Sequence, residues 1–80
     1  MNKRGLELRK ILAYNVRSYR RQKDLSQEEL ADLCGLHRTH VGSIERAERN
    51  ATLSTLDALA SALNVSVPDL LTQTGGGDEY

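Results

Sequence analysis

The sequence contains no tryptophan and no phenylalanine, and only one cysteine and one proline occur among its 80 residues. The single cysteine, Cys34, excludes an internal disulfide, which is typical of cytoplasmic proteins. No apolar run is long enough to cross a membrane, and Glu7, Arg9 and Lys10 interrupt the region where a signal peptide would be apolar. The sequence therefore predicts one small cytoplasmic domain with a core of leucine, alanine, valine and isoleucine.

Net charge is also absent, because 11 Lys and Arg balance 11 Asp and Glu, but the two signs are unevenly distributed. Residues 1–24 hold eight basic side chains and two acidic ones, whereas residues 25–80 hold three basic and nine acidic ones. A basic face on an acidic body is compatible with nucleic-acid binding. The alternative is that the basic residues form an ordinary solvated helix face, and charge alone does not decide between the two.

The spacing of apolar residues predicts five helices, and no alternating β-branched run indicates a strand. Leu8, Leu12 and Val16 fall four residues apart and define the apolar face of a first helix. Ser26 and Glu29 form a capping box, and Pro68 suits the first turn of the last helix. The expected helices cover about residues 6–22, 27–34, 38–46, 53–63 and 67–72. We expect an all-α domain over residues 1–73, followed by a flexible glycine-rich tail at residues 74–80.

The second and third expected helices meet the steric requirements of a helix-turn-helix unit. Ala31 is small enough for two helices to cross closely, and Gly35 permits the sharp turn between them. At 100° per residue, Val41 and Ile44 point to the core. The outer face then carries small or polar residues that could approach a DNA groove, namely Thr39, Gly42, Ser43 and Arg46, with Arg38 at its edge.

These motifs resemble the Cro/phage-repressor type helix-turn-helix family, also called XRE. The resemblance is carried by LSQEELA at residues 25–31, GLHRTHV at residues 35–41 and IER at residues 44–46. It extends over about residues 16–71 and implies a five-helix, lambda-repressor-like DNA-binding domain. Residues 35–39 and 43–50 are particularly similar to controller proteins of restriction–modification systems.

The resemblance implies a role for each matching position. The residues expected to read base edges are Arg38, Thr39 and Ser43. The residues expected to contact phosphates are Ser26, Gln27, His37, His40, Arg46 and Asn50. Arg20 and Glu45 match an ion pair that joins the first helix to the recognition helix. Asp24 departs from the family pattern, in which glycine is common, and the net charge is less basic than in many relatives.

The predicted function is sequence-specific regulation of transcription by a homodimer bound to a near-palindromic site on double-stranded DNA, with restriction–modification genes as candidate targets. From the resemblance and the small core we expect the last two helices to form the dimer interface, with Leu63, Val65, Val67, Leu70 and Leu71 as candidates. The alternative is a protein-interaction module, such as an antitoxin or co-regulator, which would carry a large apolar patch on the recognition face.

No enzyme is predicted, because the sequence has no phosphate-binding loop, no nucleophile–base signature and no plausible pair of catalytic carboxylates. The spacing of Cys34, His37 and His40 superficially suggests metal ligands. A fourth ligand is missing and the three residues straddle a turn, so no metal site is expected. We likewise expect no cofactor, no small-molecule ligand and no membrane partner.

Overall fold

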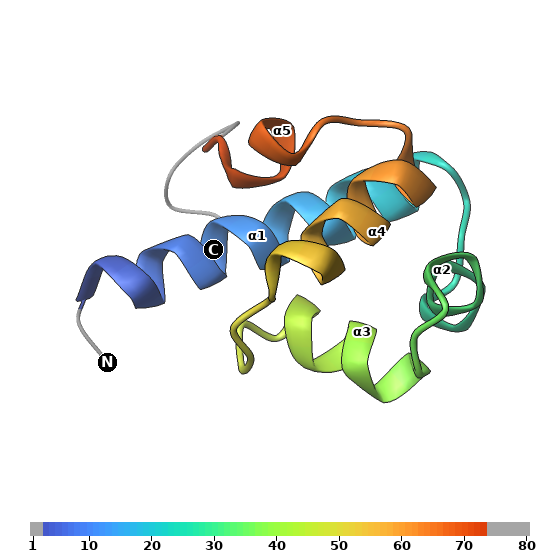
Figure 1. Ribbon diagram of the computed structural model, residues 1–80, viewed down its shortest axis with the longest axis horizontal. Coiled ribbons are helices and arrows are strands. Elements are labelled where there is room, and N and C mark those ends of the chain that lie inside the picture. Colours follow the sequence, from blue (N-terminus) through green and yellow to red (C-terminus); the bar gives the residue numbers. More distant parts are fainter. Residues whose placement is uncertain (1–2, 74–80) are drawn as a thin grey trace.

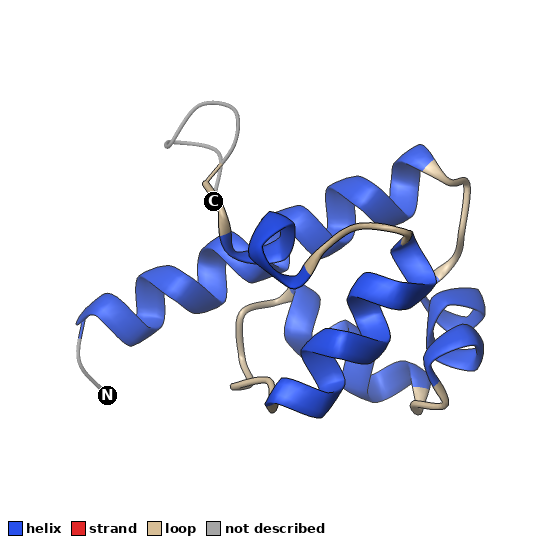
Figure 2. Cartoon of the chain, turned by 45° about the horizontal axis from the view of Figure 1, so that its top comes forward, coloured by secondary structure: helices blue, strands red, loops and turns tan. Residues whose placement is uncertain are grey.

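The computed structural model describes residues 3–73, and all regular structure within this range is helical (Figures 1 and 2). The elements are α1 (Lys3–Gln22), α2 (Gln27–Cys34), α3 (Arg38–Glu45), α4 (Leu53–Leu63) and α5 (Val67–Leu71). The predicted all-α class is confirmed. Helix α1 begins earlier than the apolar spacing indicated, because that spacing marks only the packed part of the helix. The expected tail at residues 74–80 lies outside the described residues.

The short helices begin at the capping residues that the sequence indicated. The Ser26 hydroxyl accepts a hydrogen bond from the Glu29 amide at 3.0 Å, and the Ser26 amide donates to the Glu29 carboxylate at 2.8 Å. Ser66 and Asp69 repeat the arrangement at α5, and the bond from the Ser66 backbone lowers the pKa of Asp69. Because helices of five and eight residues are unstable alone, these caps and the surrounding packing must hold them.

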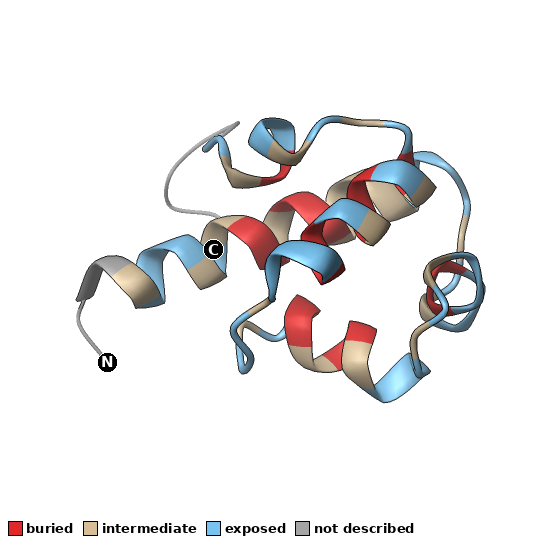
Figure 3. Cartoon of the chain, viewed as in Figure 1, coloured by how far each residue is buried: buried red, intermediate tan, exposed pale blue. Residues whose placement is uncertain are grey.

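Helix α1 is the central element, and it contacts α3, α4 and α5, while α2 packs against α3 and α4. The N-terminal half of α1 extends beyond the other helices (Figure 1), which leaves Leu6 and Leu8 exposed. Buried residues line the inner faces of the helices (Figure 3). The core cluster consists of Leu12, Val16, Leu30, Ala31, Val41, Ile44, Leu56, Leu59, Ala60, Leu63 and Leu70. No helix in the described range is long and apolar enough to cross a membrane.

Two of the side chains expected at a dimer interface belong to this core instead. Leu63 is 1% exposed and Leu70 is 0% exposed within the single chain, so neither can pack against a second copy. The expectation for these two residues is wrong, because α4 and α5 turn their apolar faces onto α1 and onto each other. Val65, Val67 and Leu71 are half-buried, so part of each side chain remains accessible.

A buried asparagine fixes α5 to α1, and no local pattern in the sequence indicated it. Asn15 is 1% exposed, and its side-chain amide donates to the backbone carbonyls of Leu70 at 2.9 Å and Thr72 at 2.8 Å. A longer contact reaches the carbonyl of Asp69 at 3.3 Å. These bonds satisfy carbonyls at the C-terminal end of α5, which have no partner within so short a helix.

Candidate nucleic-acid interface

The turn between α2 and α3 sets the geometry of the candidate interface. Gly35 ends α2 with φ of 69°, and the Leu36 amide then donates to the Ala31 carbonyl at 2.9 Å. His37 caps α3, because its Nδ1 accepts a hydrogen bond from the Thr39 amide at 3.2 Å. In the neutral ring this leaves the proton on Nε2, which is the donor available to a phosphate.

The N-terminal end of α3 is polar and accessible. Arg38 and Thr39 are exposed, and Arg38 has no side-chain partner within the described part of the chain. The Thr39 hydroxyl lies 2.8 Å from Nδ1 of His37. The exposed large apolar residues of the described range lie on α1, α2 and α4 rather than on α3. A face of this kind can enter a DNA groove without bulky apolar groups in the way.

Ser43 was expected to read a base edge, but its hydroxyl is bonded twice within the protein. It donates to the His40 carbonyl at 2.9 Å and accepts from Nε of Arg49 at 2.9 Å. The hydroxyl oxygen keeps one lone pair that could accept from a base amino group, whereas donating to a base would require the bond to the His40 carbonyl to be exchanged. Arg49 was missed by the sequence reasoning, although its spacing of three residues from Arg46 could have indicated a second cation beside α3.

The expected ion pair between α1 and α3 is present and almost fully buried. Nε of Arg20 lies 2.7 Å from Oε2 of Glu45, and a second guanidinium nitrogen donates to Oε1 at 2.9 Å. This bonding raises the pKa of Arg20. The third nitrogen donates to the Leu25 carbonyl at 2.8 Å, and Gln27 donates to Oε1 of Glu45 at 3.1 Å. These bonds connect the start of α2 and the end of α3 to α1.

This cluster changes the expected surroundings of α3. The Gln27 side chain points to Glu45 and uses one of its two N–H donors there, and its backbone lies in the first turn of α2, so its phosphate contact stays a prediction. Gly42, expected on the outer face, is buried beneath neighbouring side chains. A Cβ added there would lie 3.0 Å from the Arg46 guanidinium and 3.6 Å from Oε1 of Gln27.

The remaining phosphate candidates are in different settings. Ser26 serves as the cap of α2. His40 is half-buried, and burial together with the charge of Arg49 lowers its pKa. Arg46 is exposed and pairs with Glu48 at 3.1 Å, an arrangement that DNA could displace easily because exposed pairs contribute little. Asn50 is exposed but lines a hollow on the side of Leu8, Leu56 and Leu71 rather than the face of α3.

Cys34 takes part in packing. Its thiol donates to the Ala58 carbonyl of α4 at 3.6 Å, and burial raises the pKa of the thiol. Within residues 3–73, no group of three potential ligand side chains is close enough to hold a metal ion.

Comparison with known proteins identifies clear relatives. A family model described as Helix-turn-helix matches residues 16–70. Control protein C.SmaI of Serratia marcescens is 63% identical over 70 residues, which cover 88% of this chain and 83% of that protein. Control protein C.BamHI of Bacillus amyloliquefaciens is 40% identical over 72 residues, with 89% of each chain covered.

Solved structures agree with these similarities. The structure of the restriction-modification controller protein C.AhdI from Aeromonas hydrophila matches with a TM-score of 0.75 and 40% identity, over 78% of this chain and 94% of that one. A hypothetical transcription factor from Neisseria, NHTF, matches with a TM-score of 0.80 and 48% identity, over 82% and 76% of the two chains.

Proposed function

Because the chain belongs to the helix-turn-helix family, we propose that it binds double-stranded DNA at a specific sequence and regulates transcription there. The observation that carries this proposal is the N-terminal face of α3, where Arg38 and Thr39 are exposed on a rigidly held helix. The buried bonds from Arg20 and Gln27 to Glu45 hold that helix in a single orientation. Such preorganisation favours readout of base edges over loose electrostatic attraction.

Arg38 is the proposed principal base-reading residue. A guanidinium at this position could donate to O6 and N7 of a guanine, a contact worth about 1–3 kcal/mol of discrimination. Arg38→Ala is expected to weaken binding to the selected duplex far more than binding to a scrambled duplex. Arg46→Ala is the matched control, since loss of a phosphate contact should weaken both equally. Equal losses for Arg38→Ala would assign Arg38 to the phosphate backbone.

We further propose that the protein acts as a homodimer on a near-palindromic site. Two copies of α3 in successive major grooves would lie about 34 Å apart. The accessible parts of Val65, Val67 and Leu71 support an interface around α5. Sedimentation at micromolar concentration, with and without the site, tests this; a monomer in both conditions contradicts it. The expected cytoplasmic location stays a prediction.

The similarity to the restriction-modification controller protein C.AhdI, together with the two relatives named control proteins, supports a more specific target, the genes of a restriction–modification system. The testing experiment is selection of bound duplexes from a random pool at near-physiological salt. Enrichment of a two-fold palindrome with half-sites about one helical turn apart is the expected result. Weak binding without enrichment, abolished as salt rises, would leave only nonspecific attraction to phosphates and would contradict the proposal.

A further inference from the structure

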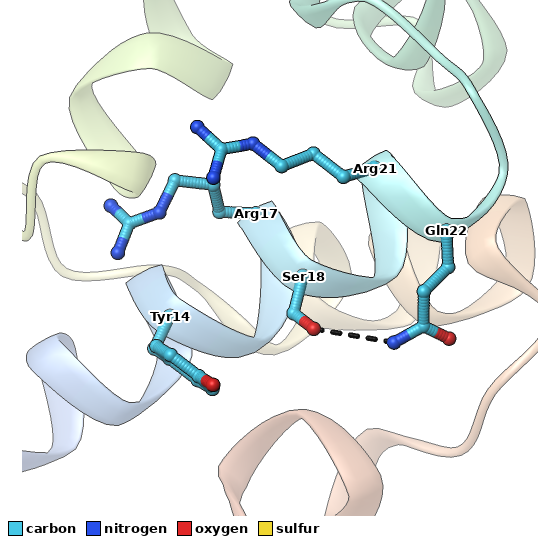
Figure 4. A pocket seen from close by; sticks show the side chains of 5 residues that line it. All are labelled: Tyr14, Arg17, Ser18, Arg21 and Gln22. Carbon is cyan, nitrogen blue, oxygen red and sulfur yellow. Dashed lines mark hydrogen bonds between the residues drawn. The ribbon is translucent and has the colours of Figure 1, made fainter. Parts of the chain in front are cut away.

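A band of basic side chains runs along α1 beside the recognition helix. The band consists of Lys10, Arg17 and Arg21, whose spacing of seven and four residues places them on one side of the helix. Figure 4 shows Arg17 and Arg21 extending toward the side of α1 on which α3 lies, and both line one hollow together with Tyr14, Ser18 and Gln22. Three of the eight basic side chains of residues 1–24 thus share one side of α1.

Contacts with α3 connect this band to the candidate interface. Arg17 donates to the Glu45 carbonyl at 3.0 Å, so its guanidinium is held at the C-terminal end of α3. A shallow hollow of about 320 Å³ lies at the same place and is lined by Lys10, Ala13, Arg17, Glu45, Arg46 and Ala47. The band therefore continues into Arg46, a residue already expected to contact phosphate.

The charge of the band is largely uncompensated. Lys10 and Arg21 are exposed, and neither side chain has a hydrogen bond or ion pair within residues 3–73. The carboxylate of Glu45 is buried and bonded to Arg20. Glu7 is the one acidic residue within α1, and it lies near the projecting end of the helix. The band consequently presents a surplus of positive charge next to α3.

We propose that this band is a second DNA-binding surface, on which Lys10, Arg17 and Arg21 contact phosphates flanking the base pairs read by α3. The inference rests on the proposed function. The rise of the helix separates the first two cations by about 10.5 Å and the last two by about 6 Å along α1, so they follow an extended anion rather than surround a single ion. Phosphate contacts of this kind position the protein and carry no sequence information.

The salt dependence of DNA binding tests the proposal. Lys10→Gln and Arg21→Gln are made separately, and each removes one positive charge from an exposed side chain without a partner. Ser61→Glu, on the exposed face of α4, is the matched control because it changes the net charge equally. Each phosphate contact contributes about 0.9 to the slope of the logarithm of the DNA association constant against the logarithm of the salt concentration. A dimer loses two contacts in each Gln variant, so the magnitude of this slope is expected to fall by about 1.8. By the same relation, the ratio of the wild-type association constant to that of the variant should fall about twelvefold between 50 and 200 mM salt.

Support requires the reduced slope for both Gln variants, an equal loss on selected and scrambled duplexes, and an unchanged slope for Ser61→Glu. Lys10→Arg and Arg21→Lys keep the charge and should keep the wild-type slope, which separates a charge effect from a folding defect. If both Gln variants keep the salt slope of the wild-type protein, the proposal is overturned, and an acidic protein becomes the candidate partner of the band. If the wild-type protein prefers no duplex, the proposed function fails. The salt slopes of nonspecific DNA binding by the wild-type protein and the two Gln variants would then still show whether the band contacts phosphates.

Discussion

The buried cluster around Glu45 predicts a large loss of stability from Glu45→Gln, a substitution that barely changes the shape of the side chain. In Glu45→Gln the carboxylate becomes an amide of the same shape, and its NH2 group must face donors of Arg20 or Gln27. In the present structure these donors lie 2.7, 2.9 and 3.1 Å from the two carboxylate oxygens. Because Glu45 is 3% exposed and Arg20 is 12% exposed, water cannot replace the lost partner well.

The expected magnitude follows from this burial. Removing one partner of a buried ion pair costs about 3–5 kcal/mol, because the remaining charge stays desolvated. A domain of this length is stabilised by roughly 4–12 kcal/mol in total. The substitution should therefore remove a large share of the stability, and the unfolding temperature should fall by more than about 12 °C.

Urea unfolding followed by far-ultraviolet circular dichroism measures the effect. Glu48→Gln is the matched control, because Glu48 pairs with Arg46 at a similar distance but is 57% exposed. It should cost less than about 1 kcal/mol. The double variant Arg20→Met with Glu45→Gln should lose less than the sum of the two single losses, since no charge is then left alone.

The reasoning is refuted if Glu45→Gln loses no more free energy of unfolding than Glu48→Gln. Strict additivity in the double variant would also count against it, because additive losses mean that the two side chains do not stabilise one another.

Three further predictions concern other parts of the structure. Ala47 has φ of 59°, so Ala47→Gly should stabilise the protein by about 1 kcal/mol in urea unfolding, whereas Ala58→Gly within α4 should destabilise it; a loss in both would contradict the strain at Ala47. Asn15→Ala leaves carbonyls of α5 without a donor and should cost about 1–3 kcal/mol, with amide exchange accelerating first in α5; uniform acceleration in every helix would not fit. Because folding lowers the pKa of His40 from 6.5, the unfolded chain binds the proton more readily than the folded one. The contribution of His40 to the free energy of unfolding is therefore fully present above pH 6.5 and is lost as the pH falls through the pKa of the folded state. His40→Gln should remove that part of the pH dependence, and an unchanged profile would exclude His40 as its source.

The sequence determined those features whose cause lies within a few neighbouring residues. Helix positions follow from apolar spacing, and the capping boxes at Ser26 and Ser66 need only a partner three residues away. The turn at Gly35 follows from the freedom of glycine to adopt positive φ. The Arg20–Glu45 pair spans a longer distance, and it was predictable only because the resemblance to a known family supplied the pairing.

Tertiary structure alone decided the contacts between residues that are distant in sequence. The pattern that places a leucine on an apolar face does not distinguish the core from a dimer interface, so the burial of Leu63 and Leu70 required the packed helices. Asn15 reaches carbonyls more than 50 residues away, and nothing near it in sequence requires this. Likewise, only the packing of α1 against α3 shows that Gln27 points inward and that Arg17 lies at the end of the recognition helix. Hydrogen bonds and burial depend on which side chains meet, and that is set by the arrangement of all five helices together.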